Sequence, residues 1–142
     1  MSHRRSIALS VIGPFLLFNL PVRADVVTLR GGNRIEGLIL DHKTNEREIR
    51  LLTLKGEVPI PRSQAVDVRQ EGTALERYEF AQKLLKADDV SSQFELARWC
   101  EANDLAAAAK GRLEQVIHLD PNHAAARRLL GFVRQNGQWV KL

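Results

Sequence analysis

The first part of the chain alternates between apolar and polar positions in short runs that are separated by turns. Runs of this kind, rich in Val, Ile and Leu, are typical of β-strands. Gly31 and Gly32 favour a tight hairpin between the first two runs, because glycine reaches positive φ angles at little cost. The pattern predicts five short strands, at residues 25–29, 34–41, 49–54, 58–61 and 65–69.

The second predicted strand alternates between two faces. In the second strand one face has Ile35, Gly37 and Ile39, and the other has Glu36, Leu38 and Leu40. The fourth strand contains Pro59 and Pro61, which donate no backbone hydrogen bond and therefore belong at an edge or a bend. Short strands with tight turns are typical of small barrels, so we expect a five-stranded antiparallel β-barrel over residues 25–71.

The pattern changes to a helical period after Gly72. Thr73 and Glu76 have the spacing of a capping box, which begins a helix over residues 74–86. Two further apolar stripes predict a second helix around Phe94 to Glu101 and a third from Leu105 to Ile117. Asp120 and Pro121 favour the start of a fourth helix, whose apolar side holds Ala126, Leu129, Leu130 and Val133. The fold class is therefore α+β, with a helical segment over residues 73–142.

The helical segment repeats part of its own pattern. Leu96-Ala97 aligns with Leu130-Gly131 when the chain is compared with itself. The offset between them matches the length of a tetratricopeptide repeat, which is about 34 residues. Small residues, Ala97 and Ala109, stand where two helices of such a repeat meet. Residues 90–142 therefore resemble one divergent tetratricopeptide repeat and half of another. Cys100 and Gln93 replace its usual aromatic residues.

The predicted barrel resembles the small five-stranded barrels of the Sm and Src-homology type. The stretch VTLRGGNRIEGLIL, residues 27–40, is similar to the opening of an Sm domain. The second motif of that domain, an Ile-Arg-Gly segment, has no counterpart between Val66 and Gly72. Asp41 also lies closer to Gly37 than the first Sm motif requires. The resemblance therefore implies the fold and does not extend to RNA binding.

Residues 1–24 have the order of a secretory signal peptide. Arg4 and Arg5 precede an apolar run over residues 6–20, and Val22 and Ala24 form a small-residue exit. We expect export to the periplasm or the exterior, with cleavage after Ala24. An uncleaved membrane anchor is the alternative, although the run is shorter than the about 20 residues of a comfortable span.

Removal of this segment changes the charge of the chain. The whole sequence has 21 basic and 17 acidic side chains, and positions 1–24 contribute three arginines and no acid. The remaining 18 basic and 17 acidic side chains give a net charge of +1. The basic pI of the full chain is therefore poor evidence for a nucleic-acid partner.

Residues that could carry chemistry have better structural explanations. His118 and His123 are five apart with a proline between them, which is the wrong spacing for two metal ligands on one helix. Cys100 lies on an apolar stripe and is expected to fill the core rather than react. Asp88 and Asp89 are expected to cap a helix. No catalytic motif is present, so we predict no catalytic residue, metal or cofactor.

Four residues near the C-terminus are candidate partner-binding residues. Trp139 follows the last predicted helix, either as a lid over its open face or as an anchor for a partner. Arg127, Arg128 and Arg134 could bind an acidic peptide or a wall polymer, or simply form a solvated helix face.

The function predicted from these features is a non-catalytic interaction or scaffold module of the cell envelope, which binds a protein or peptide rather than nucleic acid. One alternative is an accessory subunit or a small hydrolase, which convergence of His42 with Glu46 and Glu48 would support. The other is an Sm-like nucleic-acid-binding protein, against which export and a net charge near zero argue.

Overall fold

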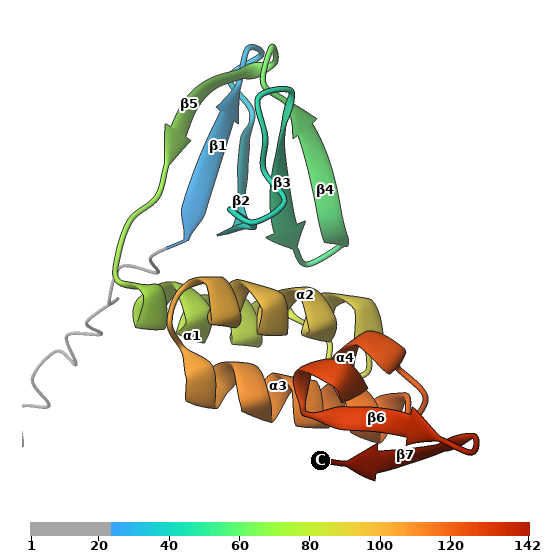
Figure 1. The fold of residues 1–142 in the computed structure, drawn as a ribbon. Coiled ribbons are helices and arrows are strands. Elements are labelled where there is room, and N and C mark those ends of the chain that lie inside the picture. Colours follow the sequence, from blue (N-terminus) through green and yellow to red (C-terminus); the bar gives the residue numbers. More distant parts are fainter. Residues whose placement is uncertain (1–23) are drawn as a thin grey trace, which may run out of the picture.

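A computed structural model describes residues 24–142 (Figure 1), so most of the predicted signal peptide lies outside the described residues. Five strands come first in the chain and four helices follow, as the predicted α+β class requires. The strands are β1 (Asp25–Leu29), β2 (Arg34–Ile39), β3 (Glu48–Thr53), β4 (Gly56–Pro61) and β5 (Ala65–Arg69). The helices are α1 (Ala74–Leu84), α2 (Val90–Ala102), α3 (Ala106–Leu119) and α4 (Ala124–Leu129).

The five strands form one antiparallel sheet in the order β4-β3-β2-β1-β5. Within residues 24–142 the edge strands β4 and β5 do not pair with each other, so the sheet is open and the closed barrel is not found. Pro59 and Pro61 lie in β4, at an edge as predicted. The ends of all five strands lie within about two residues of their predicted positions.

Strand β2 changes its pairing partner at Gly37. Gly37 pairs with Asp25 of β1, and the following Leu38 pairs with Leu52 of β3. A Cβ atom at Gly37 would lie 2.3 Å from the carbonyl oxygen of Leu52. Only glycine permits this close approach of two backbones, which explains the internal glycine of the strand.

The two faces of the sheet pack into different cores. One face encloses a core of the sheet itself, formed by Val27, Ile39, Ile49, Leu51 and Ile60. The other face meets the helices, where Leu38, Leu40 and Leu52 pack against Ala81, Leu96, Trp99 and Cys100. The alternation predicted for β2 is confirmed, because Ile39 faces the first core while Leu38 and Leu40 face the second.

The first two helices begin at the predicted caps. Thr73 and Glu76 form the predicted capping box of α1. Asp89 caps α2 by accepting a hydrogen bond from the Ser92 amide at 3.1 Å. Helix α2 then packs beside α3 (Figure 1), with Ala97 and Ala109 buried as expected for small contact residues.

The fourth helix differs from its prediction. Residues 121–122 form a turn, and α4 begins at Ala124 with His123 as its cap, whose Nδ1 accepts from the Ala126 amide. Gly131 adopts a φ of +85° and follows the end of the helix. The placement of Val133 on a helix is therefore wrong, and Leu130-Gly131 does not begin a second helical repeat.

The last residues form a β-hairpin of β6 (Phe132–Gln135) and β7 (Gln138–Lys141). Asn136 and Gly137 join the strands with φ angles of 48° and 80°. Two successive positive φ angles are typical of a type I′ turn, and Asn-Gly is the pair that favours it. No helix in residues 24–142 is long and apolar enough to cross a membrane.

Candidate functional site

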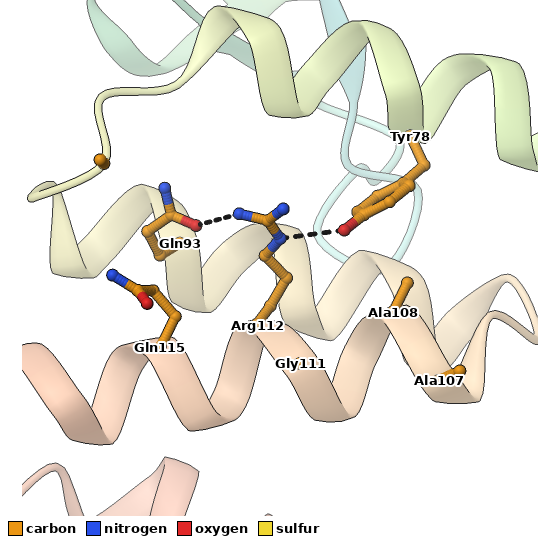
Figure 2. A pocket seen from close by; sticks show the side chains of 8 residues that line it. Tyr78, Gln93, Ala107, Ala108, Gly111, Arg112 and Gln115 are labelled. Atoms are coloured by element: carbon orange, nitrogen blue, oxygen red, sulfur yellow. Dashed lines mark hydrogen bonds between the residues drawn. The ribbon is translucent and has the colours of Figure 1, made fainter.

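A hollow lies between α1, α2 and α3, on the helical half of the molecule (Figure 2). Its volume is about 490 Å³. The α3 side consists mainly of small residues, Ala107, Ala108 and Gly111. Arg112 projects from α3 into this hollow, which we call the Arg112 pocket.

Neutral groups hold the Arg112 guanidinium. Its Nε donates to the Tyr78 hydroxyl at 3.0 Å, its Nη1 to Gln93 Oε1 at 3.1 Å and its Nη2 to Gln82 Oε1 at 2.9 Å. The guanidinium also lies over the Tyr78 ring, 5.6 Å from its centroid. No carboxylate among residues 24–142 forms an ion pair with Arg112.

Gln93 of α2 fixes the position of Arg112. This residue is only 2% exposed. Its Nε2 donates to the Lys86 carbonyl oxygen at 3.0 Å, which leaves Oε1 to accept from Arg112. A buried amide with both ends bonded holds one orientation. The guanidinium is therefore held in place before any ligand arrives.

The chemistry that this pocket offers is the binding of an anion. A guanidinium has five N–H donors, and three of them are used by the neutral acceptors. The described part of the chain has no group of three His, Cys, Asp or Glu side chains that could hold a metal ion. Cys100 is buried near Arg112, and burial raises the pKa of its thiol to about 12, although Arg112 opposes this shift. The thiol is thus protonated at neutral pH and fills the core, as predicted.

A second charged cluster joins the sheet to α2. Lys43 Nζ contacts Glu57 at 2.6 Å and Glu95 at 2.9 Å, and His42 contacts Glu95 at 3.4 Å. Burial alone would lower the pKa of Lys43, but its hydrogen bonds to Glu57 and Glu95 raise it overall. Lys43 therefore stays protonated, and its two ion pairs connect the sheet to helix α2.

This cluster bears on the hydrolase alternative. That alternative expected His42 to converge with Glu46 and Glu48. In the structure His42 contacts Glu95 instead, and Glu48 forms its ion pair with Arg50 at 2.6 Å. The arrangement that would have supported a hydrolase is therefore not formed by these residues.

A third polar cluster is buried where β1 meets α1, and no pattern in the sequence predicted it. Asp25 is 1% exposed and accepts hydrogen bonds from Arg77 Nε at 2.9 Å, Arg77 Nη2 at 2.8 Å and the Ile39 amide at 2.7 Å. Arg77 also lies 5.1 Å from the centroid of the Trp99 ring. Burial raises the pKa of Asp25 above its ordinary value, although the hydrogen bond from Arg77 opposes this. Its role is structural, because little of it reaches solvent.

The four predicted partner-binding residues lie at the C-terminal helix and hairpin, apart from the Arg112 pocket. Trp139 pairs across the hairpin with Arg134, whose guanidinium is 5.5 Å from the ring centroid. Arg127 covers the Phe132 ring at 4.8 Å. Arg128 is exposed, and its side chain makes no hydrogen bond or ion pair with the described residues. The roles of Trp139 as a lid or an anchor both stay predictions.

No pattern in the sequence singled out Arg112 and its acceptors. Tyr78 and Gln82 are four residues apart, so that they share one face of α1, and a run of alanines and one glycine precedes Arg112. These signals are visible, but the contacts between the helices that bring them together are not encoded in any local pattern. Comparison of the chain with known protein families, curated proteins and solved structures gives no match.

Proposed function

We propose that the protein is an exported, non-catalytic interaction module that binds a carboxylate of a protein or peptide partner in the Arg112 pocket. One observation carries the proposal. Arg112 is a cation in a hollow, held by three neutral acceptors and without an ion-pair partner among residues 24–142.

A carboxylate fits the donors that remain. Each terminal nitrogen of Arg112 uses one N–H on a glutamine and keeps one more. Arginine binds carboxylates through two parallel hydrogen bonds, which are stronger than bonds between neutral groups. The small residues of α3 leave room for the main chain of a peptide. The C-terminal carboxylate of a peptide and the side chains of Asp and Glu are the groups of this chemistry.

The wider architecture is consistent with such a module. We regard α2 and α3 as one divergent repeat of the tetratricopeptide kind, which the buried contact residues Ala97 and Ala109 support. We regard the sheet as a small barrel left partly open, which the core enclosed by its five strands supports. Export is proposed from the order of basic, apolar and small residues before Asp25.

A titration followed by nuclear magnetic resonance tests the pocket. The probes are two pools of acetylated tetrapeptides of mixed sequence without acidic side chains, one ending in a free carboxylate and one in an amide. We expect the Arg112 Nε–Hε signal and the Gly111 amide signal to shift with the first pool only. Equal shifts with both pools, or none at Arg112, would contradict the proposal.

Two variants locate the response. Arg112→Gln removes the charge, and the shifts that depend on the carboxylate should disappear. Arg34→Gln is the matched control, because this exposed arginine forms no side-chain hydrogen bond or ion pair with the described residues and lies outside the pocket. It should respond as the unaltered protein does. A loss of response in both variants would indicate general attraction to positive charge instead of a site.

A further inference from the structure

Charge is distributed unevenly along the described chain. Residues 121–142 contain four basic side chains and no Asp or Glu, whereas residues 25–120 contain 14 basic and 17 acidic side chains. The C-terminal end of the molecule therefore carries a charge of +4 and the rest carries −3, with histidines neutral. A net charge of +1 for the whole hides this separation.

The basic residues share one face with two aromatic rings. The cross-strand pairs Phe132–Lys141 and Arg134–Trp139 are two positions apart, so all four side chains lie on the same face of the hairpin. Lys141 Nζ is 5.7 Å from the Phe132 ring centroid, and Arg127 of α4 covers the same ring. We call Arg127, Phe132, Arg134, Trp139 and Lys141 the cationic hairpin face. None of its cations forms an ion pair with a residue in 24–142.

Exposed aliphatic side chains occur in the same segment. Leu129, which lines a hollow together with Lys141, is 40% exposed, and Leu142 is 86% exposed. Val140 is also 40% exposed, but it pairs with Val133 and therefore lies on the opposite face of the hairpin. Cations together with exposed apolar and tryptophan side chains are typical of segments that lie at the surface of a membrane. We propose that the C-terminal helix and hairpin attach the protein to an anionic lipid surface.

The observations favour a lipid surface over a nucleic acid. Proteins that bind single strands without sequence preference stack the bases on free aromatic faces, and here cations already cover the Phe132 and Trp139 rings. Exposed Leu129, which lies beside Lys141, would gain nothing from a polyanion in water, whereas a lipid interface accepts it. The hairpin lies at the end of the molecule that is farther from the five-stranded sheet (Figure 1), and the net negative charge of residues 25–120 opposes contact of that part with an anionic surface.

Sedimentation with vesicles tests this attachment on the exported form recovered from cells. One set of vesicles is phosphatidylcholine alone, and the other mixes two parts of phosphatidylcholine with one part of phosphatidylglycerol. Each cation near an anionic surface contributes about a fivefold factor, so we expect binding to rise at least about 100-fold in the second set at low salt. The increase should fall as salt screens the surface.

Two variants with equal changes of charge assign the effect to its site. Changing Arg127, Arg128, Arg134 and Lys141 together to Gln should abolish the preference for anionic vesicles. The matched control changes four exposed cations outside the C-terminal helix and hairpin to Gln, namely Arg34, Arg47, Lys55 and Lys83. This control should keep the preference for anionic vesicles. Loss of the preference in both variants, or in neither, would overturn the proposal.

A measurement on the unaltered protein does not depend on how the variants fold. Trp99 is buried and Trp139 lies on the cationic hairpin face, so brominated lipid should quench the emission of Trp139. We expect quenching with brominated vesicles that contain the anionic lipid, and none with vesicles of brominated phosphatidylcholine alone. No quenching in either case would overturn the proposal. So would retention of a short single-stranded oligonucleotide by protein that binds no vesicles.

Discussion

Two arginines of the helical half have similar surroundings and opposite pairing. Arg77 lies over the Trp99 ring at 5.1 Å, and Arg112 lies over the Tyr78 ring at 5.6 Å. Arg77 donates two hydrogen bonds to the carboxylate of Asp25, whereas Arg112 donates three to a phenol and two amides. The difference between the two sites is the presence of an internal anion.

This difference separates a structural charge from an available one. In the buried pair of Arg77 and Asp25 each charge has lost its water and gained the other, and Arg77 also lies 3.6 Å from the exposed carboxylate of Asp41. Arg112 lines a hollow, and its neutral acceptors position the cation without cancelling its charge. The same side chain therefore joins two layers of the fold in one place and, in the function that we propose, presents a binding group in the other.

Removal of Arg77 should have the largest effect on the stability of the protein. In Arg77→Met the carboxylate of Asp25 stays buried without its cation, which costs about 3–5 kcal/mol of the free energy of unfolding. Urea denaturation of the variant and of the unaltered protein measures the difference. A loss below about 1 kcal/mol, the size expected of an exposed ion pair, would show that Asp25 and Arg77 are not a closed pair.

Acid should reduce the cost of that substitution. The folded pKa of Asp25 is raised by burial, so its contribution to stability is fully present below its unfolded pKa and is lost as pH rises through the folded pKa. Arg77 opposes that rise, and Arg77→Met should raise the pKa of Asp25 further. The difference in the free energy of unfolding between Arg77→Met and the unaltered protein should be largest at pH 7 and shrink towards pH 4. Adding Asp25→Asn should remove this dependence on pH.

Removal of Arg112 should destabilise the protein less. Arg112→Met breaks three hydrogen bonds between a cation and neutral groups, but Tyr78 and Gln82 are not fully buried and can bond to water instead. The main cost is the buried Gln93 Oε1 that loses its donor, and we expect about 1–2 kcal/mol. Thermal melts of Arg112→Met and Arg77→Met compare the loss of stability in the two variants. An equal loss in both would mean that Arg112 is structural as well.

An internal anion should convert the second site into a copy of the first. Gln82→Glu places a carboxylate where Gln82 Oε1 now lies, 2.9 Å from Arg112 Nη2. The new group competes with a peptide carboxylate, so the affinity for the free-carboxylate peptides should fall about tenfold, while stability changes by less than about 1 kcal/mol. Gln115→Glu is the control and should have the smaller effect, because Gln115 lines the pocket without contributing to the three bonds that hold Arg112.

The smallest effect is expected at Cys100, which packs in the core between the sheet and the helices. Its thiol is buried and its pKa is raised to about 12, so that little reactive thiolate exists at neutral pH. A maleimide should label the denatured protein and leave the native one unmodified over the same time. Rapid labelling of native protein would mean that this core opens readily. Labelling should become faster in Arg77→Met than in Arg112→Met.

Local signals predicted most of the elements and none of the long-range charge contacts. The strands, the capping box at Thr73 and the proline-containing edge strand follow from neighbours in sequence. The partners of Arg112 lie 19, 30 and 34 residues away, and the partner of Arg77 in β1, Asp25, lies 52 residues away. Such pairs depend on how helices and sheet pack, which periodicity does not specify.

The incorrect fourth helix has a different cause. Leu129, Leu130 and Val133 have helical spacing, but the turn chemistry of Asn136-Gly137 prevails over that period. These two residues readily adopt positive φ angles and are flanked by alternating residues, which together favour a hairpin. Arg134 and Trp139 are both candidates from the sequence, but only the hairpin register pairs them across two strands.

Burial of both of its faces makes β2 sensitive to changes in length. Leu38 and Ile39 are adjacent, yet they belong to the helix-facing core and the core inside the sheet. Deleting one residue of β2 before them would turn each side chain to the opposite face and damage both cores at once. Insertions and deletions should therefore accumulate in the 42–47 loop during evolution, while the length of β2 stays fixed.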